Sequence, residues 1–248
     1  MDVRSSTDLF SQEFSVPIDL ARSIDHTLLK PEASERDIRQ LVTEAITHRF
    51  ASVCVNGRWV ALASQLLRAA GADQGDTPIK TCAVVSFPLG AAKTSVKAME
   101  AVAAVKDGAH EIDMVISLAS LQSGNLDEGR ADVFEVVRMA RTARRETLVK
   151  VILETAALTE EQTALGCAAA REGGADFVKT STGFHPKGGA TVETVALLKK
   201  YSGGLRVKAA GGIRDLATAQ KMLAAGADRL GCSASVAIVQ GAASNATY

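Results

Sequence analysis

The sequence has few aromatic residues and no excess of either charge. Phe, Trp and Tyr together make up 4% of its 248 residues, and 28 Lys and Arg balance 28 Asp and Glu. Proteins that bind nucleic acids or anionic lipids usually carry a basic surface, and single strands are often bound by stacking bases on aromatic side chains. The composition therefore argues against a protein that binds nucleic acid or a membrane.

Cysteine is also scarce, and its four positions are far apart. No C-x-x-C pair and no nearby pair of histidines accompanies them, so we expect reduced thiols in a cytoplasmic protein, without disulfides or a zinc site. Residues 1–18 lack the long apolar core of a signal peptide or a membrane span. We expect them to form an N-terminal extension, followed by a single domain, residues 19–248, that ends in a short C-terminal tail.

Short apolar segments rich in Val, Ile and Ala recur eight times along the chain. They are Ile24–Leu29, Ala51–Asn56, Lys80–Phe87, Ala109–Ser117, Thr147–Glu154, Ala175–Thr182, Arg206–Ile213 and Asp228–Ser233. Segments with the apolar spacing of a helix lie between them, for example 34–49 and 126–145. Ser34 and Thr159 stand where the N-terminal caps of helices are expected.

This alternation of strand and helix predicts parallel strands joined by right-handed crossovers. Eight such units in a chain of ~250 residues are what a (β/α)8 barrel, or TIM barrel, requires. A doubly wound open sheet is the alternative, and it favours a G-x-G-x-x-G turn after its first strand. The segment 24–31, I-D-H-T-L-L-K-P, contains no such turn, so we expect the barrel.

Two lysines interrupt apolar strands near the ends where a barrel carries its function. Lys179 lies in A-D-F-V-K-T-S-T-G-F and Lys208 in R-V-K-A-A-G-G. A buried ammonium is costly unless it is paired or neutralised. Glu111 and Asp113 share one face of the fourth strand, and the fifth strand adds Lys150. Charge balance therefore predicts a lysine–carboxylate cluster inside the barrel. For either lysine alone, a structural ion pair or a solvated rim position is the alternative.

A close pair of lysines favours the chemistry of a neutral amine. A second ammonium ~5 Å away repels the first by roughly 3 kcal/mol at an effective dielectric of ~20, and burial acts in the same direction. The neutral amine can attack a carbonyl and form a Schiff base. A carboxylate such as Asp113 would then move a proton, through water, to and from the carbon next to the iminium.

Three loops that contain glycine follow strands six, seven and eight. They are 181–183 (S-T-G), 210–212 (A-G-G) and 231–233 (G-C-S). Glycine lets backbone N–H groups approach an anion, and a barrel usually binds phosphate after strands seven and eight. Lys187 or Arg214 would add positive charge. A single glycine pair is more often only a turn, but three at consecutive strand ends predict a phosphate site. Together with a nucleophilic lysine, they predict a Schiff-base enzyme for a phosphorylated sugar or aldehyde.

Six sequence blocks carry a more specific signal. They are D-H-T-L-L-K-P (25–31), E-I-D-M-V (111–115), K-V-I-L-E-T (150–155), V-K-T-S-T-G-F (178–184), V-K-A-A-G-G-I-R (207–214) and G-C-S-A-S (231–235). In this order and spacing they resemble the deoxyribose-phosphate aldolase family of the DeoC type. The resemblance implies a class I aldolase that reversibly cleaves 2-deoxy-D-ribose 5-phosphate to D-glyceraldehyde 3-phosphate and acetaldehyde. It implies no metal and no other cofactor, because the protonated imine is the electron sink.

The resemblance also implies a role for each matching residue. Lys179 is the Schiff-base lysine, Lys208 is the neighbour that lowers its pKa, and Asp113 is the proton relay. The residues that would contact phosphate are Gly183, Gly211, Gly212 and Ser233. Those around the sugar hydroxyls are Asp25, Thr27 and Lys150. Some members have a terminal tyrosine that helps to move the proton, and Tyr248 is the candidate here.

Two other functions stay open. A Schiff-base aldolase of this kind could act on another sugar phosphate, and a barrel of this kind could bind a sugar phosphate without turning it over. The presence of both lysines and the aspartate favours an enzyme. The expected partners are a small sugar phosphate and an aldehyde, and the chain could form a homodimer.

Overall fold

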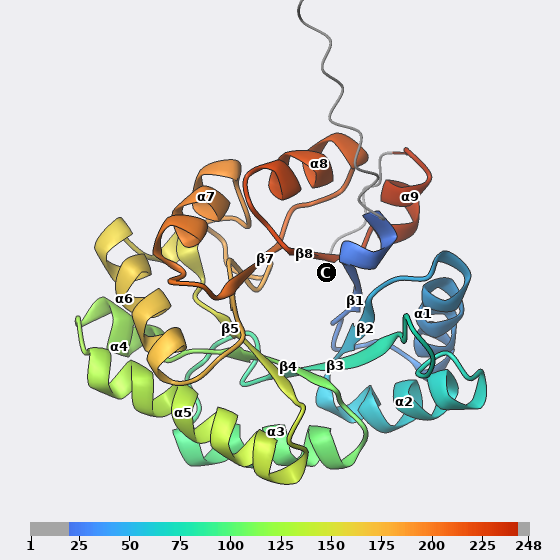
Figure 1. Cartoon of the computed structure of the whole chain (residues 1–248), viewed down its shortest axis with the longest axis horizontal. Helices are drawn as coiled ribbons and strands as arrows, with labels where there is room; N and C mark the ends of the chain where they lie inside the picture. Colours follow the sequence, from blue (N-terminus) through green and yellow to red (C-terminus); the bar gives the residue numbers. More distant parts are fainter. Residues whose placement is uncertain (1–19, 243–248) are drawn as a thin grey trace, which may run out of the picture.

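Eight parallel strands close on themselves in the computed structural model, which describes residues 20–242 (Figure 1). Each strand pairs with the next one along the chain, and β8 pairs back onto β1. The strands are β1 (Ile24–Leu28), β2 (Ser52–Val55), β3 (Lys80–Val85), β4 (Glu111–Val115), β5 (Leu148–Ile152), β6 (Phe177–Lys179), β7 (Arg206–Ala210) and β8 (Arg229–Cys232). Each predicted segment contains one strand. The (β/α)8 barrel is confirmed, and the open sheet is wrong because it would leave two strands without a partner on one side.

Helices cover the outside of the ring and connect successive strands (Figure 1). They are α1 (Glu35–His48), α2 (Val60–Ala69), α3 (Thr94–Lys106), α4 (Leu118–Gln122), α5 (Leu126–Ala143), α6 (Glu160–Glu172), α7 (Val192–Tyr201), α8 (Leu216–Ala224) and α9 (Ser235–Val239), with 3-10 helices at Leu20–Ser23, Gly57–Trp59 and Thr155–Ala157. Within residues 20–242, none of these helices has the length and apolarity needed to cross a membrane. The expected extension at residues 1–18 and Tyr248 lie outside the described residues.

Two helices begin where the sequence predicts. The side chain of Ser34 accepts the backbone N–H of Asp37 at 3.4 Å, and the carboxylate of Asp37 accepts the backbone N–H of Ser34 at 2.8 Å. Thr159 and Gln162 form the same reciprocal pair at the start of α6. Each pair satisfies N–H groups that the first turn of a helix leaves without a helical partner, so both starting points are specified locally.

The barrel interior has an apolar side and a charged side, whereas the main apolar core fills the space between the barrel and the helices. The small apolar cluster next to β1, β2 and β3 consists of Leu29, Cys54, Cys82, Val84 and Phe87. Toward β5 and β7, Lys150 and Lys208 are among the largest side chains with no exposed surface. Fully buried lysines are rare unless they are paired, which places the chemistry of this barrel inside its strands.

A buried ion pair outside the barrel holds the end of β4. Nζ of Lys97 on α3 lies 2.6 Å from the carboxylate of Asp132 on α5 and donates to the carbonyl of Val115 at 3.0 Å. The same carboxylate accepts the backbone N–H of Ser117 at 3.0 Å. Because these contacts fix the residues that follow Asp113, they help to determine where its side chain lies.

His110, just before β4, is expected to make stability depend on pH. Burial lowers its pKa to about 4, and the charges of Arg144 and Lys80 act in the same direction. In the unfolded chain the pKa is about 6.5. Above pH 6.5 the imidazole is neutral in both the folded and the unfolded protein. Between pH 6.5 and about 4 only the unfolded protein binds the proton, so the free energy of unfolding decreases as the pH is lowered through this range.

A variant tests this effect of His110. The backbone N–H of Thr81 donates to Nδ1 of His110 at 3.3 Å, and glutamine can replace that acceptor. We expect His110→Gln to lose less of its free energy of unfolding than the wild type between pH 6.5 and about 4, as measured by urea denaturation. His185→Gln controls for the loss of a histidine elsewhere. Equal losses in His110→Gln and the wild type would contradict the prediction.

Candidate active site

Asp113 lies at the centre of a buried cluster of charged side chains. Its Oδ1 accepts a hydrogen bond from Lys150 at 2.8 Å. Its Oδ2 accepts one from Lys179 at 2.8 Å and one from Lys208 at 2.7 Å. Because both ammoniums contact the same oxygen, their nitrogens are at most about 5.5 Å apart, the sum of those two distances. The predicted lysine–carboxylate cluster is therefore present.

The register of the strands brings these four side chains together. Asp113 is paired with Lys150 across β4 and β5, and Lys179 is paired with Lys208 across β6 and β7. Paired residues of a sheet project to the same face, which here is the barrel interior. Gly231 of β8 leaves room for Lys208, because a Cβ at that position would lie 3.1 Å from the Cε of the lysine.

Two more carboxylates and an arginine extend the cluster. Asp25 contacts both Lys208 and Arg229. Glu111 contacts both Lys150 and Arg229. Asp25 and Lys150, which the resemblance places around the sugar hydroxyls, are thus fully buried with charged partners on several sides. They are positioned to set the charge of the site from within the barrel.

Arg229 is the member that the sequence analysis did not identify. It stands two residues before Gly231 in a short strand, and side chains two apart in a strand share a face. That spacing could have placed Arg229 inside the barrel, where an arginine needs a buried carboxylate as a partner. Its two partners, Asp25 and Glu111, come from β1 and β4, which are not neighbours in the barrel.

The cluster keeps its members charged despite their burial. Burial by itself raises the pKa of Asp113, but the three surrounding ammoniums hold that pKa well below its usual range. Burial lowers the pKa of Lys208, but Asp113 and Asp25 outweigh burial and hold that pKa well above its usual range. The pKa of Lys150 is likewise raised against burial, chiefly by Asp113. Lys208 is therefore a lasting positive charge beside Lys179.

The chain beyond β6 carries a buried hydroxyl without a partner. The hydroxyl of Thr180 donates to the carbonyl of Ala210 at 3.1 Å and accepts its backbone N–H at 3.0 Å, which ties the ends of β6 and β7 together. Ser181 is fully buried, yet its hydroxyl has no hydrogen-bond partner within residues 20–242. A buried hydroxyl two residues beyond Lys179 is a candidate contact for a polar ligand.

The glycine loops after β6 and β7 pack directly against each other. Gly183, Gly211 and Gly212 have left-handed backbone conformations with φ of 86°, 91° and 83°, which glycine adopts without strain. A Cβ on Gly211 would lie 3.0 Å from the Cα of Gly189 and 3.2 Å from the Cα of Gly183. Side chains are excluded from this contact, so the loops present backbone groups.

Ser233 and Thr27 both line a cavity of about 240 Å³ that extends toward α1. Ser235, the next hydroxyl along the chain, is fully buried and donates to the carbonyl of Cys232 at 2.9 Å. Ser233 is only half-buried, so of these two serines it is the one that can contact a bound phosphate.

The arrangement meets the geometric needs of Schiff-base chemistry. An amine nucleophile needs a neighbour that disfavours its proton and a group that can carry protons. Asp113, which can carry protons, accepts a hydrogen bond from Lys179 at 2.8 Å. Lys208, the charged neighbour, has its nitrogen at most about 5.5 Å from that of Lys179, the sum of the two distances to Oδ2. All three are less than 5% exposed, and the low dielectric of a buried site strengthens these electrostatic effects.

The sequence match to a known family covers the whole barrel. A profile described as "DeoC/LacD family aldolase" matches residues 18–244. The chain belongs to this family. It is therefore an aldolase, which is a lyase, and the resemblance of the six blocks extends to nearly all of the sequence.

Members of this family resemble the chain closely in both sequence and structure. The deoxyribose-phosphate aldolase of Carboxydothermus hydrogenoformans is 50% identical over 230 residues, which are 92% of this chain and 97% of the relative. The solved structure "QR15, an Aldolase" matches with a TM-score of 0.81 at 42% identity, covering 90% of this chain and 95% of that one. The deoxyribose phosphate aldolase from Aeropyrum pernix, described as a unique tetramer, matches with a TM-score of 0.81 at 36% identity and covers 90% of each chain.

Proposed function

We propose that this aldolase reversibly cleaves 2-deoxy-D-ribose 5-phosphate to D-glyceraldehyde 3-phosphate and acetaldehyde. The contact of both Lys179 and Lys208 with Oδ2 of Asp113 carries the proposal. Support for the substrate comes from relatives at 50% and 49% identity that are named deoxyribose-phosphate aldolase.

Lys179 is the nucleophile in this reaction. Its neutral amine attacks C1 of the open-chain sugar, and loss of water gives a protonated imine. Asp113, through water, takes the proton of the C3 hydroxyl as the C2–C3 bond breaks. The electron pair of that bond moves into the imine to give an enamine, and glyceraldehyde 3-phosphate leaves. Protonation of C2 and hydrolysis release acetaldehyde and restore the amine. The imine accepts the electrons, so the reaction requires no metal or organic cofactor.

Lys208 and Asp113 divide the supporting roles. Lys208 stays charged and so opposes a second positive charge on Lys179. A carboxylate beside Lys179 by itself favours the protonated amine. The negative charge of Asp113 is, however, also balanced by the ammoniums of Lys150 and Lys208. Asp113 passes the proton, through water, between the lysines and C2.

The strand-end loops bind the phosphorylated end of the sugar. The close packing at Gly211 leaves backbone groups of both loops to face an anion, and Ser233 adds its hydroxyl. Thr27 contacts a sugar hydroxyl, as the family resemblance implies. The buried hydroxyl of Ser181 gains its missing partner from the substrate.

Replacing Gly211 by alanine tests the phosphate site. The new Cβ meets two backbone atoms at 3.0 and 3.2 Å, so the loops must separate. We expect the KM for 2-deoxyribose 5-phosphate to rise by about tenfold or more, with a smaller change in kcat. Gly188→Ala is the matched control, because its φ is also positive, at 115°, but no atom lies within 4 Å of the new Cβ. An equal rise in the KM for unphosphorylated 2-deoxyribose would contradict a role of Gly211 in binding phosphate.

Direct turnover tests the proposed reaction. The purified chain should release acetaldehyde from 2-deoxyribose 5-phosphate, as followed by NADH oxidation with alcohol dehydrogenase, and pretreatment with EDTA should leave the rate unchanged. Faster cleavage of another sugar phosphate would show that this other compound is the substrate. Binding of sugar phosphates with no cleavage of any would favour a barrel that only binds them.

We also infer a homodimer in the cytoplasm. Val96 and Met99 on α3 and Phe134 on α5 are 51%, 69% and 53% exposed, and large exposed apolar side chains on neighbouring helices favour an interface. Light scattering should give the mass of a dimer, and a monomer at micromolar concentration would contradict the homodimer.

The state of the cysteines supports the cytoplasm as the compartment. All four cysteines are free and buried, as is usual in a reducing compartment.

A further inference from the structure

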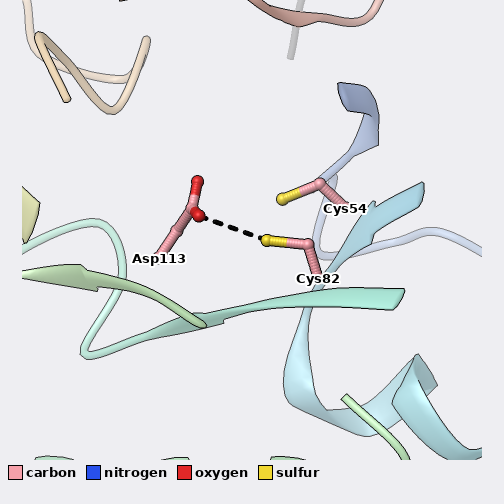
Figure 2. Close-up of side chains that lie close together, drawn as sticks. All are labelled: Cys54, Cys82 and Asp113. Carbon is pink, nitrogen blue, oxygen red and sulfur yellow. Dashed lines mark hydrogen bonds between the residues drawn. The ribbon is translucent and has the colours of Figure 1, made fainter. Parts of the chain in front are cut away.

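Cys54, Cys82 and Asp113 converge inside the barrel from three neighbouring strands (Figure 2). All three are fully buried, and one ligand atom from each lies within 4.8 Å of the others. The thiol of Cys82 donates to Oδ1 of Asp113 at 3.2 Å. The parallel register pairs Cys54 with Cys82 across β2 and β3. The proposed aldol chemistry uses neither thiol. The sequence predicted no zinc site because these cysteines are far apart in the chain, but the pairing of β2 with β3 brings them together.

These three groups match the donor set of a soft divalent cation. Zn²⁺ binds thiolate sulfur at about 2.3 Å and carboxylate oxygen at about 2.0 Å, in tetrahedral geometry. Ligand atoms of such a site lie roughly 3.5 Å apart. The sulfur of Cys82 and Oδ1 of Asp113 are 3.2 Å apart, and the other distances, at most 4.8 Å, must shorten when the metal binds. Two sulfurs and one oxygen leave a fourth position for water, and thiolates select metals such as Zn²⁺ and Cd²⁺ over Mg²⁺ or Ca²⁺.

We propose that Cys54, Cys82 and Asp113 form a binding site for one Zn²⁺ or Cd²⁺ ion per chain, and that the bound ion inhibits the aldolase. Inhibition follows from the third ligand. Oδ2 of Asp113 contacts both Lys179 and Lys208, whereas Oδ1 faces Cys82. A cation bound to Oδ1 withdraws negative charge from the carboxylate and so weakens the group that carries the proton.

Binding of the cation leaves the total charge of the buried cluster unchanged because protons are released. The two thiols release two protons as the sulfurs bind the cation, so the total charge of the buried cluster does not change. This balance matters because Lys150, Lys179, Lys208 and Arg229 already place four positive groups nearby. The ammonium of Lys150, 3.4 Å from the sulfur of Cys82 and 2.8 Å from Asp113, must give way. It keeps Glu111 as a partner.

Cadmium binding to the wild-type protein tests the site without any substrate. We expect one Cd²⁺ per chain by equilibrium dialysis, a thiolate-to-cadmium absorption band in the ultraviolet, and a 113Cd resonance in the range of sulfur ligands. Binding should release two protons and weaken as the pH falls. A 113Cd resonance typical of oxygen and nitrogen ligands alone would overturn the proposal. These readouts do not depend on which sugar phosphate the enzyme cleaves.

Three cysteine variants locate the site and its effect. Cys54→Ala and Cys82→Ala each remove a ligand, so we expect the Cd²⁺ concentration for half-inhibition to rise by about a hundredfold, relative to each variant's own metal-free rate. Cys167→Ala, which removes a buried thiol on α6, is the matched control and should behave like the wild type. Unchanged inhibition in the first two variants would overturn the site. Full occupancy with undiminished turnover would overturn the inhibition.

Discussion

Replacing Lys179 by leucine is expected to abolish turnover and the covalent adduct with acetaldehyde. In the wild type, borohydride reduces the imine to a stable secondary amine, and peptide mass spectrometry then finds an ethyl group on Lys179. Leucine fills much of the same space but has no amine, so no imine can form. The rate of cleavage should fall to the uncatalysed background, because binding alone cannot provide the electron sink.

The control for this experiment is a lysine outside the site. Lys221→Leu changes an exposed lysine on α8 and should leave both turnover and the adduct intact. Circular dichroism and urea denaturation establish that the Lys179→Leu protein is folded. An adduct that persists in that folded protein, or that maps to another residue of the wild type, would refute Lys179 as the nucleophile.

The barrel could be predicted from the sequence because its signals are local. Each strand is a short apolar run, each helix has its own periodicity, and caps such as Ser34 and Thr159 are set by residues three apart. Lys179 and Lys208 were found for the same reason, since a charged residue in an apolar run is visible without any knowledge of its neighbours.

The partners of those lysines could not be predicted in the same way. Asp25 and Arg229 are 204 residues apart in the chain, yet their side chains meet because β1 and β8 close the barrel. Strand spacing gives the face on which a side chain lies, but the level at which it meets another strand depends on the stagger of the closed sheet. The meeting of Cys54 with Cys82 depends on that register too.

The charges of the complete cluster support the proposal that Lys179 is the nucleophile. Its carboxylates are Asp25, Glu111 and Asp113, and its cations are Lys150, Lys179, Lys208 and Arg229. One cation is in excess, so one proton can leave without creating a net buried negative charge. Within residues 20–242, Lys179 contacts a single carboxylate, whereas Lys150 and Lys208 each contact at least two. Lys179 is therefore the lysine of the cluster that is held by the fewest ion pairs.

Replacing Lys208 by leucine is expected to lower turnover by roughly a hundredfold and to shift the pH profile of adduct formation upward. The excess cation disappears, so loss of a proton from Lys179 now leaves the cluster negative. Oδ2 of Asp113 is also left with Lys179 as its remaining ammonium partner. A repulsion of about 3 kcal/mol between two ammoniums ~5 Å apart, at a dielectric of ~20, corresponds to about two powers of ten.

The pH profile separates this electrostatic role of Lys208 from a merely structural one. Borohydride trapping of acetaldehyde is followed across the pH range for the wild type, Lys208→Leu and the control Lys221→Leu. A structural defect lowers the yield of adduct at every pH, whereas the loss of a repelling charge moves the midpoint to higher pH and restores the yield in base. Asp25 keeps Arg229 as a partner in the variant, so it is not left as an isolated buried charge. An unshifted midpoint in folded Lys208→Leu would show that the charge of Lys208 does not activate Lys179.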